Sequence, residues 1–293
     1  ALVADPRVAG VAFTGSTEVA RLINRALAAK DGPIVPLIAE TGGINVMVVD
    51  GTALPEQVAD DVITSAFRSA GQRCSALRVL AVEEHVADKI VEMIAGAARE
   101  LKIGDPRDLA THIGPVIDAE AKQRLDAYGA AMRARGRRGL INRTDLPASG
   151  TYVAPEIFAC DSLAEVREEV FGPILHVVRW RSETGSDRRD RGLERLMAEV
   201  AASGYGLTGG LHTRIDETIR TVERLTPAGN FYVNRNMIGA VVGTQPFGGS
   251  GLSGTGPKAG GPNYLKRFAN EIVVTINTSA AGGNASLVAM EEE

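Results

Sequence analysis

The feature that most constrains the fold is the regular alternation of short apolar runs with stretches of helical period. Residues 10–14 have the pattern of a buried strand, and residues 18–29 repeat apolar side chains at helical spacing. Two more apolar runs, at 35–39 and 45–49, follow after short turns. Strands that alternate with helices favour a parallel sheet covered by helices. The sequence therefore predicts an α/β fold of the doubly wound type.

The same alternation continues through the rest of the chain, without an internal repeat or a low-complexity tract. We expect helices over residues 55–70, 86–101, 119–134, 193–203 and 216–225. We expect strands over residues 78–82, 152–158, 174–180, 209–211 and 229–234. A last run, 271–277, is too apolar to remain a free sheet edge, so we expect it to pair with another subunit.

The composition is that of an ordinary soluble globular protein, with a formal net charge of −4. Basic residues at 133–138 and 179–191 form local surface segments, and nothing in the charge balance favours nucleic-acid binding. No apolar run approaches the roughly 20 residues that span a bilayer, and no signal peptide opens the chain. Because the chain does not begin with methionine, we expect it to be a piece of a longer protein.

The cysteines and histidines add further constraints. Cys160 follows an apolar run and is interpreted as structural, which leaves Cys74 as the candidate reactive thiol. A sparse pair of cysteines indicates a reducing compartment, so we expect a cytoplasmic protein, with membrane association of the complete parent left open. No metal site is predicted, because none of the histidines has a metal-ligand spacing to Cys, Asp or Glu: they are His85, His112, His176 and His212.

One cysteine and one acid carry the clearest chemical signal. Cys74 lies between a helical pattern and an apolar strand pattern, and Arg73 beside it could lower the pKa of the thiol. Glu40 closes an apolar run and is followed by Gly42 and Gly43, which allow close backbone approach. A thiol nucleophile and a carboxylate at element ends are what a thioacyl mechanism with a hydrolytic step requires. The structural alternatives are a buried cysteine and a surface acid.

Gly15 and Ser16 lie on the first predicted strand-to-helix turn. Ser16 or Thr17 is a natural N-cap, and donors at the positive end of a helix also suit a phosphate group. The glycine-rich stretch 247–258 matches neither the phosphate loop nor the dinucleotide fingerprint, because no Gly-Lys-Ser/Thr opens a helix there and no strand leads directly into it. We interpret this stretch as a flexible binding loop with exposed backbone N–H groups.

Taken together, five motifs resemble those of the aldehyde dehydrogenase superfamily, in the family's order and over nearly the whole chain. They are F-T-G-S-T at 13–17, E-T-G-G at 40–43, G-Q-R-C at 71–74, E-E-V-F-G-P at 168–173, and Asn234 with P-F-G-G at 246–249. Any one of them is weak, but the ordered set is specific. The resemblance implies a three-layer aldehyde dehydrogenase-like fold and an NAD-dependent enzyme that acts on an aldehyde.

The same resemblance implies roles for individual residues. Cys74 would attack the aldehyde carbon, and Glu40 would activate the water that hydrolyses the thioacyl enzyme. The presence of Glu40 argues against acyl transfer to coenzyme A, because relatives with that activity usually lack this acid. Four residues are implied to bind NAD through its diphosphate, its nicotinamide ribose or its nicotinamide ring: Gly15, Ser16, Glu169 and Phe171.

Two further stretches, 243–262 and 277–287, resemble the L-glutamate γ-semialdehyde (pyrroline-5-carboxylate) dehydrogenase module of bacterial bifunctional enzymes of proline catabolism. This implies oxidation of that semialdehyde to L-glutamate, a homo-oligomer, and a covalently linked flavin proline dehydrogenase. The α-amino acid group of such a substrate needs hydroxyl and N–H donors for its carboxylate. The implied substrate-binding residues are Ser75, Ser253, Gly254 and Phe268, whose ring would wall the aliphatic chain.

The resemblance also divides the chain. Residues 1–41 would be the remnant of an NAD-binding domain, 42–250 the catalytic domain, and 251–293 a substrate-anchor loop, a return segment and an oligomerisation strand. The earlier half of the family's cofactor domain, with its oxyanion-hole asparagine and adenosine-ribose lysine, has no counterpart in this sequence. Two alternatives therefore stay open: a dehydrogenase for another semialdehyde or an aliphatic aldehyde, and a non-catalytic folded or oligomerising fragment.

Overall fold

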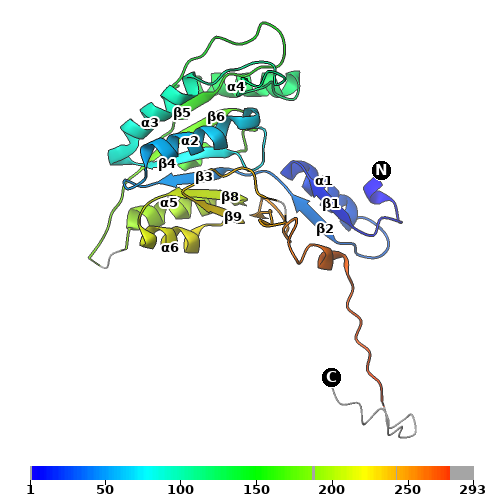
Figure 1. The fold of residues 1–293 in the computed structure, drawn as a ribbon. Helices are drawn as coiled ribbons and strands as arrows, with labels where there is room; N and C mark the ends of the chain where they lie inside the picture. Colours follow the sequence, from blue (N-terminus) through cyan, green and yellow to red (C-terminus); the bar gives the residue numbers. More distant parts are fainter. Residues whose placement is uncertain (1, 187–188, 242, 278–293) are drawn as a thin grey trace.

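A six-stranded parallel sheet forms the centre of the molecule (Figure 1), in a computed structural model that describes residues 2–186, 189–241 and 243–277. Its strands lie in the order β5-β6-β4-β3-β8-β9. Their bounds are β3 (Asn45–Val49), β4 (Leu77–Glu83), β5 (Glu156–Ala159), β6 (Ile174–Trp180), β8 (Thr208–His212) and β9 (Asn230–Val233). Because the chain extends the sheet in both directions from β3, the sheet is doubly wound, and the predicted α/β class is confirmed.

Helices cover both faces of this sheet. On one face α2 (Pro55–Phe67) packs beside α3 (Glu84–Arg99), and on the other α5 (Arg191–Ala202) packs beside α6 (Asp216–Leu225) (Figure 1). A further helix, α4 (Ala119–Ala134), lies near β5. Every residue of β3 and β8 is buried, which is expected of parallel strands covered on both faces.

Most predicted elements are present, and several have the predicted bounds. The helices α4 and α6 and the strands β3 and β6 begin and end at the predicted residues. The strand expected from residue 152 begins only at Glu156, because Pro155 has no N–H to donate to a sheet. The helix expected to reach residue 70 ends at Phe67 and continues as a short 3-10 turn, η2 (Arg68–Gly71).

The first two strands form a separate small sheet, which corrects the expectation of one continuous sheet. β1 (Val11–Thr14) pairs in parallel with β2 (Leu37–Glu40), and α1 (Thr17–Ala28) connects them. Only residues 41–44 separate β2 from β3. A parallel neighbour in the same sheet needs a crossover of at least about ten residues. The chain therefore crosses from the small sheet into the large one at this connection.

The C-terminal part contributes a strand to a third, two-stranded sheet and makes an isolated antiparallel bridge to the small sheet, between Gly254 and Glu40. β10 (Ser250–Gly251) pairs antiparallel with β7 (Tyr205–Gly206), and the 3-10 turn η4 (Leu265–Phe268) follows. In the described part of the chain, residues 271–277 pair with no strand, and their apolar side chains are exposed. The expected strand is therefore not formed among the described residues. Pairing with another subunit stays a prediction, and residues 278–287 of the motif lie outside the described residues.

The short 3-10 turns η1 (Leu2–Ala4) and η3 (Leu163–Glu165) complete the described elements. Within the described residues, no helix has the length and apolar character needed to cross a membrane.

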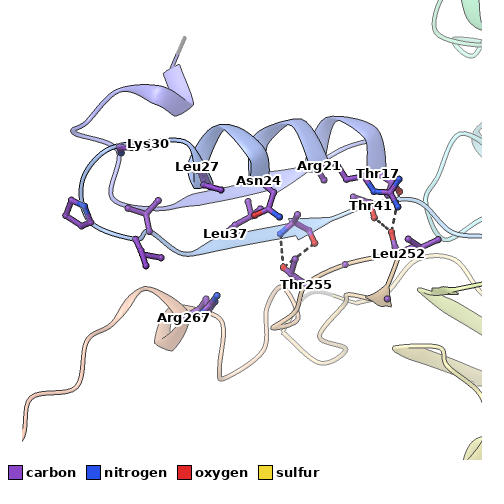
Figure 2. Close-up of a pocket in the computed structure, with 18 of the residues that line it drawn as sticks. Thr17, Arg21, Asn24, Leu27, Lys30, Leu37, Thr41, Leu252, Thr255 and Arg267 are labelled. Atoms are coloured by element: carbon purple, nitrogen blue, oxygen red, sulfur yellow. Dashed lines mark hydrogen bonds between the residues drawn. The ribbon is translucent and has the colours of Figure 1, made fainter.

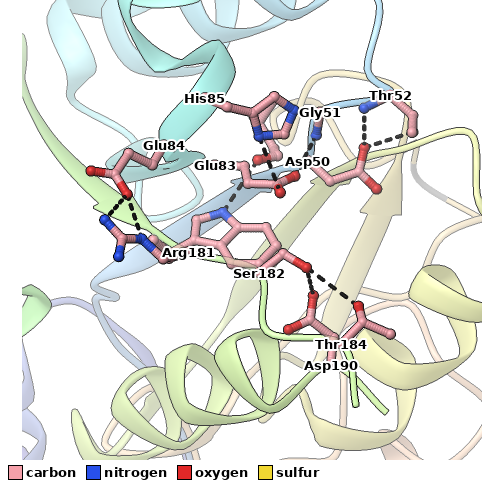
Figure 3. A network of polar contacts seen from close by, with 12 residues as sticks. Asp50, Gly51, Thr52, Glu83, Glu84, His85, Arg181, Ser182, Thr184 and Asp190 are labelled. Atoms are coloured by element: carbon pink, nitrogen blue, oxygen red, sulfur yellow. Dashed lines mark hydrogen bonds and ion pairs between the residues drawn. The ribbon is translucent and has the colours of Figure 1, made fainter. Parts of the chain in front are cut away.

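The carboxyl edge of the large sheet is closed by polar contacts (Figure 3). There the N–H of Gly51 donates to the Glu83 carboxylate at 2.7 Å, and Nδ1 of His85 lies 3.2 Å from the same carboxylate. Arg181 forms an ion pair with Glu84 at 2.7 Å. Ligands of open α/β sheets usually bind at this edge. Here its polar groups pair with one another, and the chemistry-bearing side chains gather at the opposite edge.

Candidate active site

Cys74 lies on the turn that leads into β4, at the amino edge of the large sheet. The buried amide of Asn45, at the start of β3, donates to the carbonyls of Cys74 at 2.6 Å and Ala76 at 2.8 Å. Its oxygen accepts from the N–H of Thr208 at 3.1 Å, on β8. A fully hydrogen-bonded buried amide fixes the groups around it. Three strands thus hold the turn, and the half-buried thiol is placed as the sequence predicts.

A cavity of about 860 Å³ lies over this turn. One wall comes from the carboxyl ends of β1 and β2, and the other from the amino edge of the large sheet. Six of the predicted site residues line it: Gly15, Ser16, Cys74, Ser75, Glu169 and Phe171. Other lining residues include Gln72 and Phe247, which lie in the quoted motifs but had no assigned role, and Arg124, which the sequence analysis did not single out. The fold therefore brings the predicted nucleophile and the four predicted cofactor residues into one space.

Gly15 and Ser16 place the N-terminal end of α1 at this cavity. The N–H of Gly15 donates to the carbonyl of Glu40 at 3.1 Å, which ties the turn to the end of β2. Ser16 is the N-cap of α1, and its hydroxyl accepts from the N–H of Val19 at 3.2 Å. The predicted N-cap is confirmed. The positive end of the helix dipole also makes this corner favourable for an anion.

Glu40 lies at the end of β2 but does not line the cavity itself. One carboxylate oxygen, Oε2, accepts from the N–H of Gly249 at 2.9 Å, and Oε1 is buried without a hydrogen-bond partner among the described residues. A Cβ at Gly254 would lie 2.8 Å from Oε2, so the glycine-rich loop packs directly on the acid. Burial raises the pKa of Glu40 to about 6, against the opposing effects of the Gly249 N–H and Lys258.

Opposing effects act on the pKa of the Cys74 thiol. Burial raises its pKa, and the negative charge of Glu169 raises it further. The N–H of Ser75 and the positive charge of Arg78 act in the opposite direction. Arg73 donates from Nε to the Ser69 hydroxyl at 3.0 Å instead. The cation that acts on the thiol is therefore Arg78, rather than the Arg73 expected from the sequence.

Glu169 and Phe171 reach the cavity from the loop before β6. Oε1 of Glu169 lies 3.6 Å from Nη2 of Arg78, and burial raises the pKa of this carboxyl while Arg78 lowers it. The Phe171 ring is 46% exposed, and its centroid lies 5.5 Å from the Arg78 guanidinium. The sequence signal for Arg78 was a single arginine within an otherwise apolar strand.

Three predicted substrate-binding residues are not brought to this cavity. Ser253 is fully buried, and its hydroxyl accepts from the N–H of Gly206 at 3.0 Å. Its carbonyl accepts from the N–H of Thr41 at 2.9 Å, which clamps the loop to the end of β2. Ser253 does not line the Cys74 cavity. Of the four implied substrate residues, only Ser75 lines that space.

Gly254 borders a second cavity, of about 630 Å³, between α1, β2 and the 251–255 loop (Figure 2). Thr255 fastens this loop to β2, since its hydroxyl accepts from the N–H of Ala39 at 2.9 Å. Phe268 lies against Gly10, at the end of the small sheet far from Cys74. The geometry gives the predicted substrate roles of Gly254 and Phe268 no support.

Cys160 differs from Cys74 in its surroundings. It is buried in the core, where burial raises the pKa of its thiol to about 11. Among the described residues, no group of three or more His, Cys, Asp or Glu side chains is arranged to hold a metal ion.

The profile of the aldehyde dehydrogenase family matches residues 1–274. The chain belongs to the aldehyde dehydrogenase family. It is 55% identical over 277 residues to the bifunctional protein PutA of Klebsiella aerogenes, a match that covers 92% of this chain and 20% of that protein. The chain thus spans about a fifth of that curated relative's length.

Solved structures agree with this assignment. A crystal structure of a bifunctional proline utilization A (PutA) protein matches with a TM-score of 0.88 and 66% identity, covering 96% of this chain and 28% of that one. A 1-pyrroline-5-carboxylate dehydrogenase from Thermus, solved with bound NAD, matches with a TM-score of 0.82 and 33% identity, covering 91% of this chain and 50% of that one. The predicted family, its fold and the similarity to these dehydrogenase modules are confirmed.

Proposed function

We propose that this chain is the catalytic part of an NAD-dependent enzyme that oxidises L-glutamate γ-semialdehyde to L-glutamate, in proline catabolism. The observation that carries the proposal is the shared cavity, in which the Cys74 thiol, the Glu169 carboxylate and the N-terminal end of α1 line one space. The names of the similar proteins support the same substrate, since they include PutA proteins and a 1-pyrroline-5-carboxylate dehydrogenase.

The residues that line the cavity fit NAD. Apart from the ion pair with Arg78, Oε1 of Glu169 is buried without a hydrogen-bond partner among the described residues, and a ribose hydroxyl would supply one. Gly15 and Ser16 would hold the diphosphate at the positive end of α1. The exposed face of Phe171 would pack near the nicotinamide. When bound, NAD would accept a hydride from the carbon attached to Cys74.

The chain's own residues supply the covalent chemistry. Cys74 reacts as the thiolate, and its sulfur forms a bond to the aldehyde carbon, whose oxygen becomes negatively charged. After the oxidation, Glu40 accepts a proton from the water that attacks the thioacyl carbon. The carbon–sulfur bond then breaks, and the thiolate leaves. A carboxylate with a pKa of about 6 is ionised at neutral pH and is still basic enough for this step.

Replacing Cys74 with alanine tests the nucleophile. We expect Cys74→Ala to lower kcat for NAD-dependent semialdehyde oxidation by a factor on the order of 1,000 or more, because no other group can form the thioacyl bond. Cys160→Ala is the matched control and should retain most of the activity, since that thiol is buried in the core. Steady-state NADH formation at 340 nm measures both. Substantial activity in Cys74→Ala would overturn the assignment.

A dehydrogenase for another semialdehyde or an aliphatic aldehyde is the second candidate. The buried, hydrogen-bonded hydroxyl of Ser253 favours it, because the residue expected to recognise an amino acid substrate does not reach the cavity. Ser253→Ala separates the two functions when activity toward γ-semialdehyde is compared with activity toward a plain aliphatic aldehyde. A loss confined to the semialdehyde supports the specific substrate, and equal losses favour the general one.

We also propose the wider context of this segment. The bifunctional relatives support a covalently linked flavin proline dehydrogenase, and the exposed apolar segment 271–277 supports assembly with a second copy. Both cysteines are free thiols, which supports a reducing, cytoplasmic location.

A further inference from the structure

Arg78 is the only buried lysine or arginine in the described part of the chain, and its side chain is fully enclosed. It lies in β4, four residues after the nucleophile. Burying a cation carries a large desolvation cost unless hydrogen bonds and an opposite charge compensate it. Arg78 does not line the cavity itself, so its burial is not explained by direct contact with a ligand there. Its position needs another explanation.

The Arg78 guanidinium joins two segments that meet at the cavity. Nη2 donates to the carbonyl of Arg73 at 3.0 Å, on the nucleophile turn. Nη1 donates to the carbonyl of Gly172 at 3.1 Å, on the loop before β6. The same group lies 3.6 Å from the Glu169 carboxylate and 5.5 Å from the centroid of the Phe171 ring. One side chain thus contacts the backbone beside Cys74 and both predicted cofactor residues of the loop.

The two segments also pack directly against each other through their backbones. A Cβ at Gly71 would lie only 2.1 Å from the carbonyl oxygen of Gly172. On its other side, the backbone carbonyl of Arg78 accepts from Nδ1 of His176 at 2.9 Å. Nε2 of His176 in turn pairs with the Tyr128 hydroxyl at 2.8 Å, which connects β4 to β6 and α4. These contacts hold the backbone of Arg78 in place, and the guanidinium extends from it.

We propose that Arg78 is a positioning residue that sets the distance between Cys74 and the Glu169–Phe171 loop, by holding the Arg73 and Gly172 carbonyls on one planar fork. This inference rests on the proposed function, in which the aldehyde carbon is bound to Cys74 and the nicotinamide ribose to Glu169. Its chemistry requires an arginine, because a lysine ammonium has the charge but not the rigid pair of donors. The positive charge also offsets the effect of Glu169 on the nearby thiol.

Alkylation of Cys74 tests the bridge without any need for turnover. The rate of carbamidomethylation by iodoacetamide, followed by peptide mass spectrometry from pH 6 to pH 10, reports the ionisation of the thiol. We expect Arg78→Met to slow alkylation at pH 7 several-fold, because loss of the cation removes one of the influences that lower the pKa of Cys74. Arg78→Lys should restore most of that rate. Cys160 in the same digest reports any unfolding.

Steady-state kinetics then separate the charge from the geometry. Arg78→Lys should retain the alkylation profile and still lose about tenfold in kcat or in affinity for NAD, because it cannot hold both carbonyls. Full recovery of the kinetics in Arg78→Lys would show that the charge alone matters and would overturn the positioning role.

Arg143→Met is the matched control. Arg143 also joins two backbone carbonyls, those of Ala98 and Leu101, but it does so far from the cavity. If Arg78→Met and Arg143→Met change alkylation and kinetics equally, the effect is general loosening and the inference fails. If Arg78→Met does not fold, the double variant Arg78→Met/Glu169→Gln removes both charges, and it should alkylate more slowly than Glu169→Gln alone. The alkylation result stands even if the protein oxidises no semialdehyde, so the two proposals can fail separately.

Discussion

Glu40 illustrates how one side chain can be placed for chemistry at the expense of stability. Its carboxylate is packed by the glycine-rich loop and accepts one backbone N–H, while Oε1 has no hydrogen-bond partner among the described residues. Because these contacts compensate the burial of the carboxylate only in part, the pKa of Glu40 is raised to about 6. A perturbed carboxyl at the end of a strand, beside a cavity that contains a thiol, fits a general base better than a structural acid.

The raised pKa of Glu40 predicts a pH-dependent change in stability. The folded-state value of about 6 lies above the ordinary value of 4.5, so the fold favours the protonated acid. That stabilising contribution is complete below pH 4.5 and is lost as the pH rises through 6. Glu40→Gln should therefore be more stable than the parent at pH 8, by about 1 kcal/mol after allowance for partial exposure, and equally stable at pH 4.

Urea unfolding at the two pH values measures this difference. Glu199→Gln, at an exposed position on α5, is the control and should change little. A Glu40→Gln protein that is less stable than the parent at pH 8 would contradict the explanation. The same variant should lose the hydrolytic step, which pre-steady-state kinetics would detect as accumulation of the thioacyl enzyme.

At the residue scale, the sequence predicted the side chains that are proposed to react but not all of those that hold them. Cys74 was recognisable because it stands between a helical and a strand pattern, and Glu40 because it closes an apolar run before two glycines. Arg78 was not, since its role depends on the Gly172 carbonyl, 94 residues away in the chain. The surroundings of Ser253 were not predictable for the same reason, since they depend on the tertiary contact in which its hydroxyl accepts from the N–H of Gly206.

At the element scale, the turn between α2 and β4 determines where the nucleophile lies. Ser69, Ala70 and Gly71 have positive φ angles of 56°, 53° and 64°, so the chain leaves the helix through left-handed residues. Two of the three are not glycine, and such conformations cost about 1 kcal/mol or more each. Helical periodicity continues through these positions, which is why the sequence predicted helix to residue 70. Tertiary packing overrode the local pattern.

Gly71→Ala tests how tightly this turn is packed. We expect it to destabilise the protein by roughly 3 kcal/mol or more. The new methyl group would clash with the Gly172 carbonyl, and the alanine would have to adopt an unfavourable φ angle. Gly136→Ala is the matched control: its φ angle is 79°, but no heavy atom lies within 4 Å of the added Cβ. That variant should cost only about 1–2 kcal/mol. Thermal unfolding of both proteins measures the difference in stability. Equal losses of stability would show that the φ angle alone determines the effect.

The small sheet also shows that local sequence patterns do not assign strands to sheets. Its strands and helix were each predicted, but their separation from β3 follows from the shortness of the 41–44 connection. Propensity and periodicity describe elements one at a time, whereas the assignment of strands to sheets depends on crossover length and packing. The length of that connection was the signal that could have revealed it.

At the scale of the whole molecule, the segment 271–277 leaves several apolar side chains exposed to solvent. The side chains of Ile272, Val273 and Val274 are 85%, 89% and 75% exposed. An exposed apolar segment that belongs to no sheet is a template for pairing with another chain. Assembly through this segment would cover both its side chains and its backbone.

Paired charges in this segment should prevent assembly. We expect the double variant Ile272→Lys/Val274→Lys to shift the protein toward monomer in sedimentation velocity, because like charges on neighbouring copies repel and lysine resists burial. Leu265→Lys is the control, since Leu265 is 81% exposed but lies outside the segment. An unchanged distribution of species in the double variant would assign assembly to another surface.

The cavity between the two sheets has one further consequence. The thiol belongs to the large sheet, whereas the acid and the helix end belong to the small one, and residues 41–44 are the direct backbone link between β2 and β3. Within that link, a Cβ at Gly42 would lie 1.8 Å from the Glu169 carboxylate. A side chain there would push the Glu169 carboxylate out of the space that it shares with Cys74. A change in the link between the two sheets would therefore act directly on the contents of the cavity.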